Sequence, residues 1–553
     1  MNSVDWTAKS VRDESPFGAA PDAELGRIDR VFAISSEFLN PILVKEGRQA
    51  FKSFQFFFTF LLLLLIGWVW SVFGVSCNMP GIYYVPAGPM MIVGYWWILS
   101  FPLLVVIPFA SFLSLARERN DGTFELVSIT ILSPLQIIVG KLGSSVVQML
   151  IYLSALSPCL AFTYLLRGID ILTILVLMLY VFAGSIGLSA VGLLLATMAV
   201  GSTAQGFLMV ALGGGLLFCF FVGCITGTQL VLFGAFSVGE FDFWISQLCA
   251  FSFFVVLGML VCLAAAARIA PVGENRSTRL RSCMLLANMI IAGWCAYFTA
   301  RSYDEDVVMG FIIQAAMFWY AMGVFMTCES PVMSERVKRS LPVTSLGRVL
   351  FTWFNPGPGT GYMFAVGNVV AMTVWAVGVM VVVQVGKGGT FDVDVFVLGL
   401  ICSAYVVLYL GLIRLVIAGI RRFVSCGMLW GSLLHMVFLL GGTACALGGQ
   451  WGILYEFNYS PLQIANPFWT TFKAAEGNIL VYTAPILPGV PVVPVMLVTG
   501  AILVFVLNLF SVVDEMRYKH KEAPERVLAD ELELHPQPEK VDTATNPWDQ
   551  PEG

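Results

Sequence analysis

Twelve long runs of apolar residues constrain the fold of this chain more than any other feature. They lie at about 54–75, 90–114, 144–166, 171–199, 207–225, 244–267, 283–300, 308–327, 363–386, 395–418, 425–448 and 490–513. A run of roughly 20 apolar residues is long enough for an α-helix to cross the hydrocarbon core of a bilayer. Backbone polar groups in lipid have to be satisfied internally, which favours helices. The sequence therefore predicts an all-α, polytopic membrane protein with about 12 transmembrane helices.

The composition agrees with lipid as the main solvent of this chain. Of its 553 residues, 58% are apolar and only 12% are charged, whereas soluble domains carry about 25% charged residues. An ordinary soluble globular fold is therefore excluded, and the lipid bilayer is the expected surrounding. The net charge of -5 argues against a nucleic-acid partner.

Lys and Arg residues sort to alternate sides of the predicted spans. With the N-terminus inside, most of them fall in cytosolic segments, and the external loops hold only Arg167, Arg301, Lys387 and Lys473. Cytoplasmic loops of membrane proteins carry the excess of Lys and Arg. The pattern predicts a multi-pass protein of the plasma (inner) membrane with both termini in the cytosol.

The spans divide the chain into four predicted parts. Residues 1–37 form a cytosolic N-terminal tail, and residues 514–553 form an acidic, proline-bearing cytosolic tail that we expect to be disordered. Between the tails, 38–281 and 282–513 hold six predicted spans each. The second part is either a degenerate repeat of the first, which would make the chain an internal pseudodimer, or an accessory domain; a homodimer of the chain is a further alternative.

The segment before the first span reads as an interfacial helix over 41–53. Asn40 is suited to cap a helix, and a proline follows at the first helical position. Apolar and basic residues then lie along separate stripes, which is typical of a helix lying in the membrane interface. The alternative is a solvated extension of the first span. The residues singled out here are Asn40, Pro41, Lys45, Glu46 and Arg48.

The segment 117–141 after the second span contains two helix starts. Asp121 can cap a short helix, and Ser133-Pro134-Leu135-Gln136 has the form of a capping box with proline at the first helical position. The two starts predict a helical hairpin at the inner surface, with an exposed turn suited to contact another protein. A plain loop that follows the positive-inside rule is the alternative.

The residues of this segment resemble the signature of ABC-2 type transporter permeases, and the resemblance covers roughly 38–281. In that family the segment couples the membrane domain to a separate ATP-binding cassette (ABC) ATPase subunit, and the stretch after Asn40 resembles the family's connecting helix. The resemblance implies that Glu118, Arg119 and Glu125 contact the ATPase, that Lys141 anchors the second arm, and that Ser133 and Pro134 fix the angle between the arms. The implied coupling residues are Arg117, Glu118, Arg119, Gly122, Thr123, Glu125, Ser133, Pro134 and Lys141.

Motifs for nucleotide binding and for metal-dependent catalysis are absent from the sequence. No phosphate-binding loop of the G-x-x-x-x-G-K-[ST] type and no H-E-x-x-H motif occur, so ATP hydrolysis would belong to a partner, and we expect no enzyme activity, cofactor or metal site in this chain. His435 is predicted to pack or line a pore, and Arg414 to snorkel to the inner interface. The alternative functions are an ion-gradient-driven secondary transporter and a non-transport membrane scaffold.

Two further segments leave alternatives open. Residues 329–342 match the hairpin in position but lack its Gly-Thr-x-Glu motif. Residues 226–243 mix glycine with phenylalanine, and they are either a re-entrant hairpin or an aromatic-rich surface loop.

Overall fold

The computed structural model describes the chain over 40–122, 132–199, 201–234, 237–271, 273–302, 304–330, 334–339, 344, 347, 351–386, 393–424, 427–454, 459–477, 479, 491–516, 524 and 526. Helices make up the regular structure of this described part, and it contains no strand. Twelve of the helices are long and apolar enough to cross a membrane. The prediction of an all-α polytopic protein is confirmed.

The twelve spans follow one another along the chain, and the longest connections lie between α12 and α15 and between α17 and α19. In order they are α3 (Phe54–Cys77), α4 with α5 (Gly88–Phe101 and Ile107–Asn120), α7 (Pro134–Leu165), α8 (Ile171–Met198), α9 (Ser202–Leu232), α10 (Phe241–Ile269), α11 (Ser277–Ser302), α12 (Glu305–Thr327), α15 (Pro358–Gly386), α16 (Val393–Ile420), α17 (Met428–Leu454) and α19 (Val492–Met516).

The second span is interrupted by a π-helical segment, η2 (Pro102–Val106), between α4 and α5. Proline lacks a backbone N–H, and both Pro102 and Pro108 therefore remove donors that an α-helix would use. The altered register leaves the Leu103 carbonyl available, and the Ser185 hydroxyl of α8 donates a hydrogen bond to it. Side chains of neighbouring helices thus satisfy the backbone where the span is irregular.

The segment 226–243 is helical at both of its ends, which neither of the two expectations from its sequence included. Its first part continues α9 to Leu232, and its last part begins α10 at Phe241. Phe241 and Phe243 thus belong to α10, and Phe233 directly follows the end of α9.

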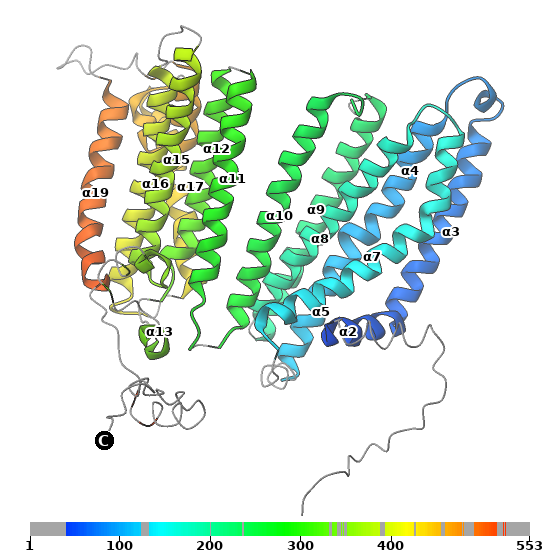
Figure 1. Ribbon diagram of the computed structural model, residues 1–553, viewed down its shortest axis with the longest axis horizontal. Coiled ribbons are helices and arrows are strands. Elements are labelled where there is room, and N and C mark those ends of the chain that lie inside the picture. Colours follow the sequence, from blue (N-terminus) through cyan, green and yellow to red (C-terminus); the bar gives the residue numbers. More distant parts are fainter. Residues whose placement is uncertain are drawn as a thin grey trace, which may run out of the picture. The chain divides into compact units, whose positions relative to one another are not determined.

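The chain separates into two compact units, Met1–Val238 and Gly239–Gly553. In the first unit, the short helix α2 (Pro41–Lys52) lies crosswise to the spans at one of their ends (Figure 1). Around it, α3 packs against α4 and α7, α4 packs against α7 and α9, and α5 packs against α7 and α8. Helix α8 also contacts α7 and α9.

The second unit repeats these neighbour relations. Its α11 packs against α12 and α15, and α12 packs against α15, α16 and α17. Helix α16 also contacts α15 and α17. The second unit in addition holds α10, which packs on α11, and α19, which packs on α16. The predicted domain boundary at 281 stays a prediction.

Polar side chains join the spans inside the second unit. The Trp319 indole of α12 donates a 2.7 Å hydrogen bond to Asn288 of α11, and Thr327 of α12 bonds His435 of α17 across 3.1 Å. Such bonds between helices replace the hydrophobic driving force that lipid does not supply.

The prediction that Arg414 snorkels to the interface is wrong. Its side chain is only 2% exposed, and it donates a 2.7 Å hydrogen bond to Asn508 and a 3.3 Å hydrogen bond to Ser511. Both partners belong to α19, which packs on α16 and separates the guanidinium from lipid.

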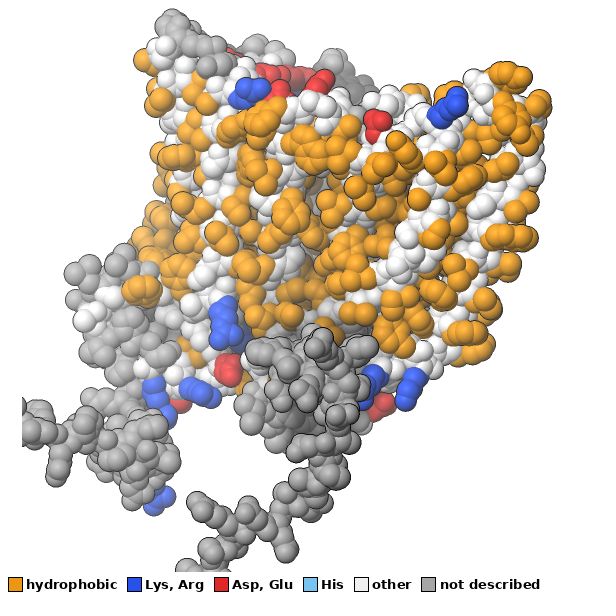
Figure 2. Space-filling model, turned by 45° about the vertical axis from the view of Figure 1, so that its right-hand side comes forward, with side chains coloured by type: hydrophobic (Ala, Val, Ile, Leu, Met, Phe, Trp, Pro, Cys, Tyr) orange, Lys and Arg blue, Asp and Glu red, His pale blue; other side chains and the backbone are white. Residues whose placement is uncertain are grey.

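The outer surface of the helices is apolar. Figure 2 shows a face covered by hydrophobic side chains, with Lys, Arg, Asp and Glu gathered towards its two ends. Exposed residues of α3, for example Phe54, Phe57, Leu61 and Trp68, contribute to the apolar surface of the first unit. This distribution suits a protein whose flanks face hydrocarbon.

The packing of α5 on α8 yields a first prediction, since it depends on Gly192. A Cβ atom at this position would lie 2.8 Å from the backbone carbonyl oxygen of Pro108, which cannot move without displacing α5. We expect Gly192→Ala to lower the free energy of unfolding by about 1–3 kcal/mol, measured in detergent by thermal unfolding. Gly214→Ala in α9 is the control, because its Cβ meets open space. Equal effects of the two substitutions would contradict the close approach.

Candidate functional site

Helix α2 begins as the sequence predicts. The Asn40 side chain accepts a 3.0 Å hydrogen bond from the Ile42 amide, and Pro41 occupies the first helical position. The Asn40 amide group also donates a 2.6 Å hydrogen bond to the Gln136 carbonyl at the start of α7. The cap of the short helix is therefore also a link to the third span.

Helix α7 begins with the predicted capping box. The Ser133 hydroxyl accepts a 3.3 Å hydrogen bond from the Gln136 amide, and the Gln136 side chain accepts a 2.8 Å bond from the Ser133 amide. Pro134 occupies the first helical position. The predicted helix start at Ser133 is confirmed. The first arm of the expected hairpin, with Thr123 and Glu125, lies outside the described residues, and the hairpin stays a prediction.

Lys141 binds carboxylates from two other helices at this end of the first unit. Its ammonium group lies 2.9 Å from Glu46 of α2 and 2.9 Å from Glu118 of α5. It also donates a 2.8 Å hydrogen bond to the Ser114 hydroxyl of α5. Lys45 of α2 adds a second contact to Glu118, at 3.1 Å. We call Lys45, Glu46, Ser114, Glu118 and Lys141 the inner polar cluster.

The ammonium group of Lys141, at the centre of the inner polar cluster, is buried but compensated. The Lys141 side chain is only 3% exposed, and an unpaired buried ammonium would cost several kcal/mol. Its three N–H groups have three acceptors in Glu46, Glu118 and Ser114. Ser114 in turn donates a 2.8 Å hydrogen bond to the second oxygen of Glu46. Removing Lys141 takes from Glu46 and Glu118 their only buried cationic partner among the described residues.

The other predicted coupling residues lie around this cluster. Arg119 donates a hydrogen bond to the Thr197 carbonyl at the end of α8, whereas Arg117 and Arg48 are exposed. Gly122 lies two residues after the end of α5 and has a φ of 70°, a left-handed conformation that glycine adopts without strain. The structure therefore brings Glu118 and Lys141 together and holds Arg119 against the fourth span.

Two members of the cluster were missed or misjudged from the sequence. Ser114 was not singled out, and Glu46 was assigned to the interfacial helix without a partner. Glu46 lies one helical turn after Ile42, and both are buried. A carboxylate on the apolar face of an amphipathic helix is the signal that could have located Glu46.

A second polar cluster occupies the matching position of the second unit. Arg281 at the start of α11 is 1% exposed and lies 2.8 Å from Glu329, which follows α12. Glu329 also accepts hydrogen bonds of 2.8 Å from the Gly357 amide, before α15, and of 2.9 Å from Ser277. In each unit a glutamate at the end of a span, α5 or α12, therefore binds a buried cation and links this end to the start of the next span, α7 or α15. The cation belongs to the next span in the first unit and to the preceding span in the second.

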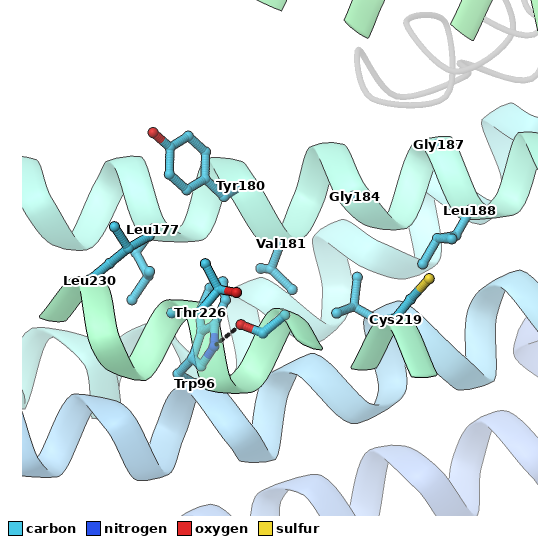
Figure 3. A pocket seen from close by; sticks show the side chains of 13 residues that line it. Trp96, Leu177, Tyr180, Val181, Gly184, Gly187, Leu188, Cys219, Thr226 and Leu230 are labelled. Carbon is cyan, nitrogen blue, oxygen red and sulfur yellow. Dashed lines mark hydrogen bonds between the residues drawn. The ribbon is translucent and has the colours of Figure 1, made fainter. Parts of the chain in front are cut away.

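An apolar pocket of about 470 Å³ lies among the spans of the first unit. Figure 3 shows Trp96 of α4 facing α8 and α9 across it. The Trp96 indole donates a 3.3 Å hydrogen bond to the Gly223 carbonyl, and a Cβ at Gly227 would lie 2.4 Å from this ring. Tyr180 and Thr226 supply the polar groups of a lining that is otherwise apolar.

Comparison with protein-family models, with curated proteins and with solved structures found no match. Among the described residues, no group of three or more His, Cys, Asp or Glu side chains is placed to hold a metal ion. The geometry of the two polar clusters and of the pocket is therefore the basis on which a function is proposed.

The burial of Lys141 yields a second prediction. We expect Lys141→Met to lower the free energy of unfolding by about 3–5 kcal/mol, because two carboxylates lose their buried partner. The matched control is Lys45→Met, whose side chain is 59% exposed; we expect it to cost about 1 kcal/mol or less. Thermal unfolding of the purified variants measures both. Similar losses in the two variants would show that Lys141 is not buried as described.

The capping box yields a third prediction. Ser133→Ala removes the acceptor for the Gln136 amide, and we expect it to cost about 1 kcal/mol. Hydrogen exchange of the Gln136 amide should accelerate, while exchange in the middle of α7 stays unchanged. Ser157→Ala, on the exposed face of the same helix, is the control and should leave the first turn protected. Unchanged exchange in Ser133→Ala would contradict the cap.

Proposed function

We propose that this chain is the membrane subunit of an exporter that is driven by a separate ABC ATPase, and that the ATPase docks on the segment 117–141. The observation that carries the proposal is the inner polar cluster. It connects the C-terminal end of α5, where this segment starts, to α7, where it ends, and to the interfacial helix α2. Residues 123–131, the expected contact with the ATPase, join these two anchored helix ends.

The cluster supports this proposal because it bonds both ends of the docking segment to the membrane spans. Lys141 and Glu118 bind each other near the helix ends, and Arg119 binds the end of α8. A displacement of the segment would therefore move α5 and α7 together and would pull on α8. Transmission of this kind needs ends that are held by buried, satisfied bonds, since exposed ion pairs contribute little.

The recurrence of the neighbour relations supports the further proposal that the chain is an internal pseudodimer. Glu329 follows α12 as Glu118 lies at the end of α5, although the cation that binds it, Arg281, comes from the preceding helix α11 and Lys141 comes from the following helix α7. Parallel repeats of this kind are common among transporters. In this proposal one copy of the chain supplies both membrane halves and engages two ATPase subunits.

The apolar pocket supports a hydrophobic or amphipathic cargo. Its lining from α4, α8 and α9 carries no charged side chain, and Figure 3 shows that small glycine positions such as Gly184 and Gly187 leave room along α8. An apolar pocket with few polar groups binds ligands mainly by burial of their apolar surface.

The proposed docking yields a fourth prediction. We expect Glu125→Lys to reduce the amount of ABC ATPase that co-purifies with the full chain in mild detergent by about tenfold, because the reversed charge removes a charge-assisted contact. ATP-driven transport in reconstituted vesicles should fall in parallel. Glu240→Lys, exposed at the start of α10, is the matched control and should retain the ATPase.

Two results would contradict the proposed function. One is that no ABC ATPase associates with the wild-type chain under these conditions. The other is that transport continues after ATP depletion and stops when an uncoupler collapses the proton gradient; this would identify the ion-gradient-driven alternative.

A further inference from the structure

A second cavity of the first unit differs from the apolar pocket because most of the side chains that line it are polar. It has a volume of about 410 Å³ and lies between α2, the start of α3, α5 and the first half of α7. Helix α2 lies crosswise to the spans at one of their ends (Figure 1), so the cavity begins at that end and extends between the spans. Its volume is in the range of small-molecule binding sites.

Two polar stripes face each other across this cavity, one on α7 and one on α5. Their members follow at spacings of three or four residues, which places each stripe on one face of its helix. The lining residues of the stripes are Lys141, Ser145, Gln148 and Tyr152 on α7, and Glu118, Ser114 and Ser111 on α5. The α7 stripe covers about 16 Å along the helix. Polar residues at this depth of a membrane span are costly, and they commonly mark a functional site.

The hydroxyl groups in the deep part of the cavity have their protons engaged. Ser111 donates a 2.9 Å hydrogen bond to a backbone carbonyl one turn away and lies 2.7 Å from the Ser145 hydroxyl. Thr59 of α3 donates a 2.8 Å hydrogen bond to a backbone carbonyl of its own helix, and the Tyr152 hydroxyl lies within hydrogen-bond distance of it. A hydroxyl has one proton and two lone pairs. These four oxygens therefore keep capacity to accept hydrogen bonds after their protons are used.

The buried charges of the cavity are not balanced among themselves. The side chains of Glu46 and Glu118 are 10% and 18% exposed, and they face the ammonium of Lys141, which is 3% exposed. The three N–H groups of Lys141 are taken by these carboxylates and by Ser114. The other charged residues of the lining are exposed, and solvent weakens their influence; they are Lys45, Arg117 and Asp121. The buried part thus holds two carboxylates for one ammonium, and it is rich in acceptors.

We propose that this cavity binds a small polyhydroxylated compound with one primary ammonium group, of the amino-sugar type. Its ammonium donates hydrogen bonds to Glu46, whose two oxygens each hold one hydrogen bond from the inner polar cluster and can each accept another. Its hydroxyl groups bond Ser145 and Gln148, about 6 Å and 10 Å beyond Lys141 along α7. An anionic ligand would face the two carboxylates, and an apolar ligand would leave the acceptors unpaired.

Three matched ligands test the proposal on the purified full chain. Glucosamine, glucose and N-acetylglucosamine share one ring and differ at a single position, which carries an ammonium, a hydroxyl or an amide group. Isothermal titration calorimetry at about pH 6, where the amine is protonated, measures each affinity. We expect glucosamine to bind about tenfold more tightly than the other two, because it gains a charge-assisted hydrogen bond. Equal affinities, or no heat of binding for glucosamine, would overturn the proposal. No ATPase takes part, so the outcome is independent of the proposed transport function.

A cavity-filling variant tests the location of the ligand. Gln148→Phe places a ring at a position that lines the cavity, and it should abolish the binding of glucosamine. Ser157→Phe adds the same ring on the exposed face of α7 and should leave binding unchanged. Circular dichroism and the thermal midpoint establish that both variants are folded. Equal affinity for glucosamine in the two folded variants would overturn the proposed site.

Glu46→Gln separates the charge of the site from its shape. The amide has the volume of the carboxylate but no charge, so we expect the affinity for glucosamine to fall to that for glucose, which stays unchanged. The two affinities are compared within one variant, and a general loss of stability would lower both without changing their ratio. Glu240→Gln, exposed at the start of α10, is the control and should keep the preference. A preference for glucosamine that survives in Glu46→Gln would overturn the assigned ammonium contact.

Discussion

The buried ammonium of Lys141 is the interaction on which the organisation of the first unit depends. A charge that is almost fully removed from water is stable only with ionic partners and satisfied hydrogen bonds, and these come from α2 and α5. The short helix α2 and two spans therefore have to assemble together. The apolar surfaces of the spans cannot impose this arrangement, because lipid solvates them as well as another helix does.

The second unit meets the same requirement with a different cation. Arg281 has more donors than a lysine, and besides Glu329 it bonds the Trp353 carbonyl at 2.6 Å and the Thr360 hydroxyl at 3.1 Å. Through these bonds it fixes the connection before α15. The helices of the two units thus have matching neighbours, and Glu118 and Glu329 have matching positions. The cations and hydrogen bonds around the two glutamates differ.

The sequence predicts those features that depend on local physics. Span positions follow from runs of apolar residues, and the caps at Asn40 and Ser133 follow from side chains that reach amides two or three residues away. The bond between Glu46 and Lys141 joins residues 95 positions apart, and no periodicity encodes that distance. The expectation for Arg414 failed for the same reason, since only the packed structure shows that α19 covers it.

The π-helical segment of the second span has a mechanical consequence for the end of the helix that carries Glu118. A π turn contains one residue more than an α turn. When the π turn shifts along a helix by one residue, that residue rotates by about 100° about the helix axis. Such shifts let α5 rotate relative to α4 while the backbone hydrogen bonds are exchanged one at a time. Pro102 and Pro108 flank the place where such a swivel costs least, since neither has an amide hydrogen to lose.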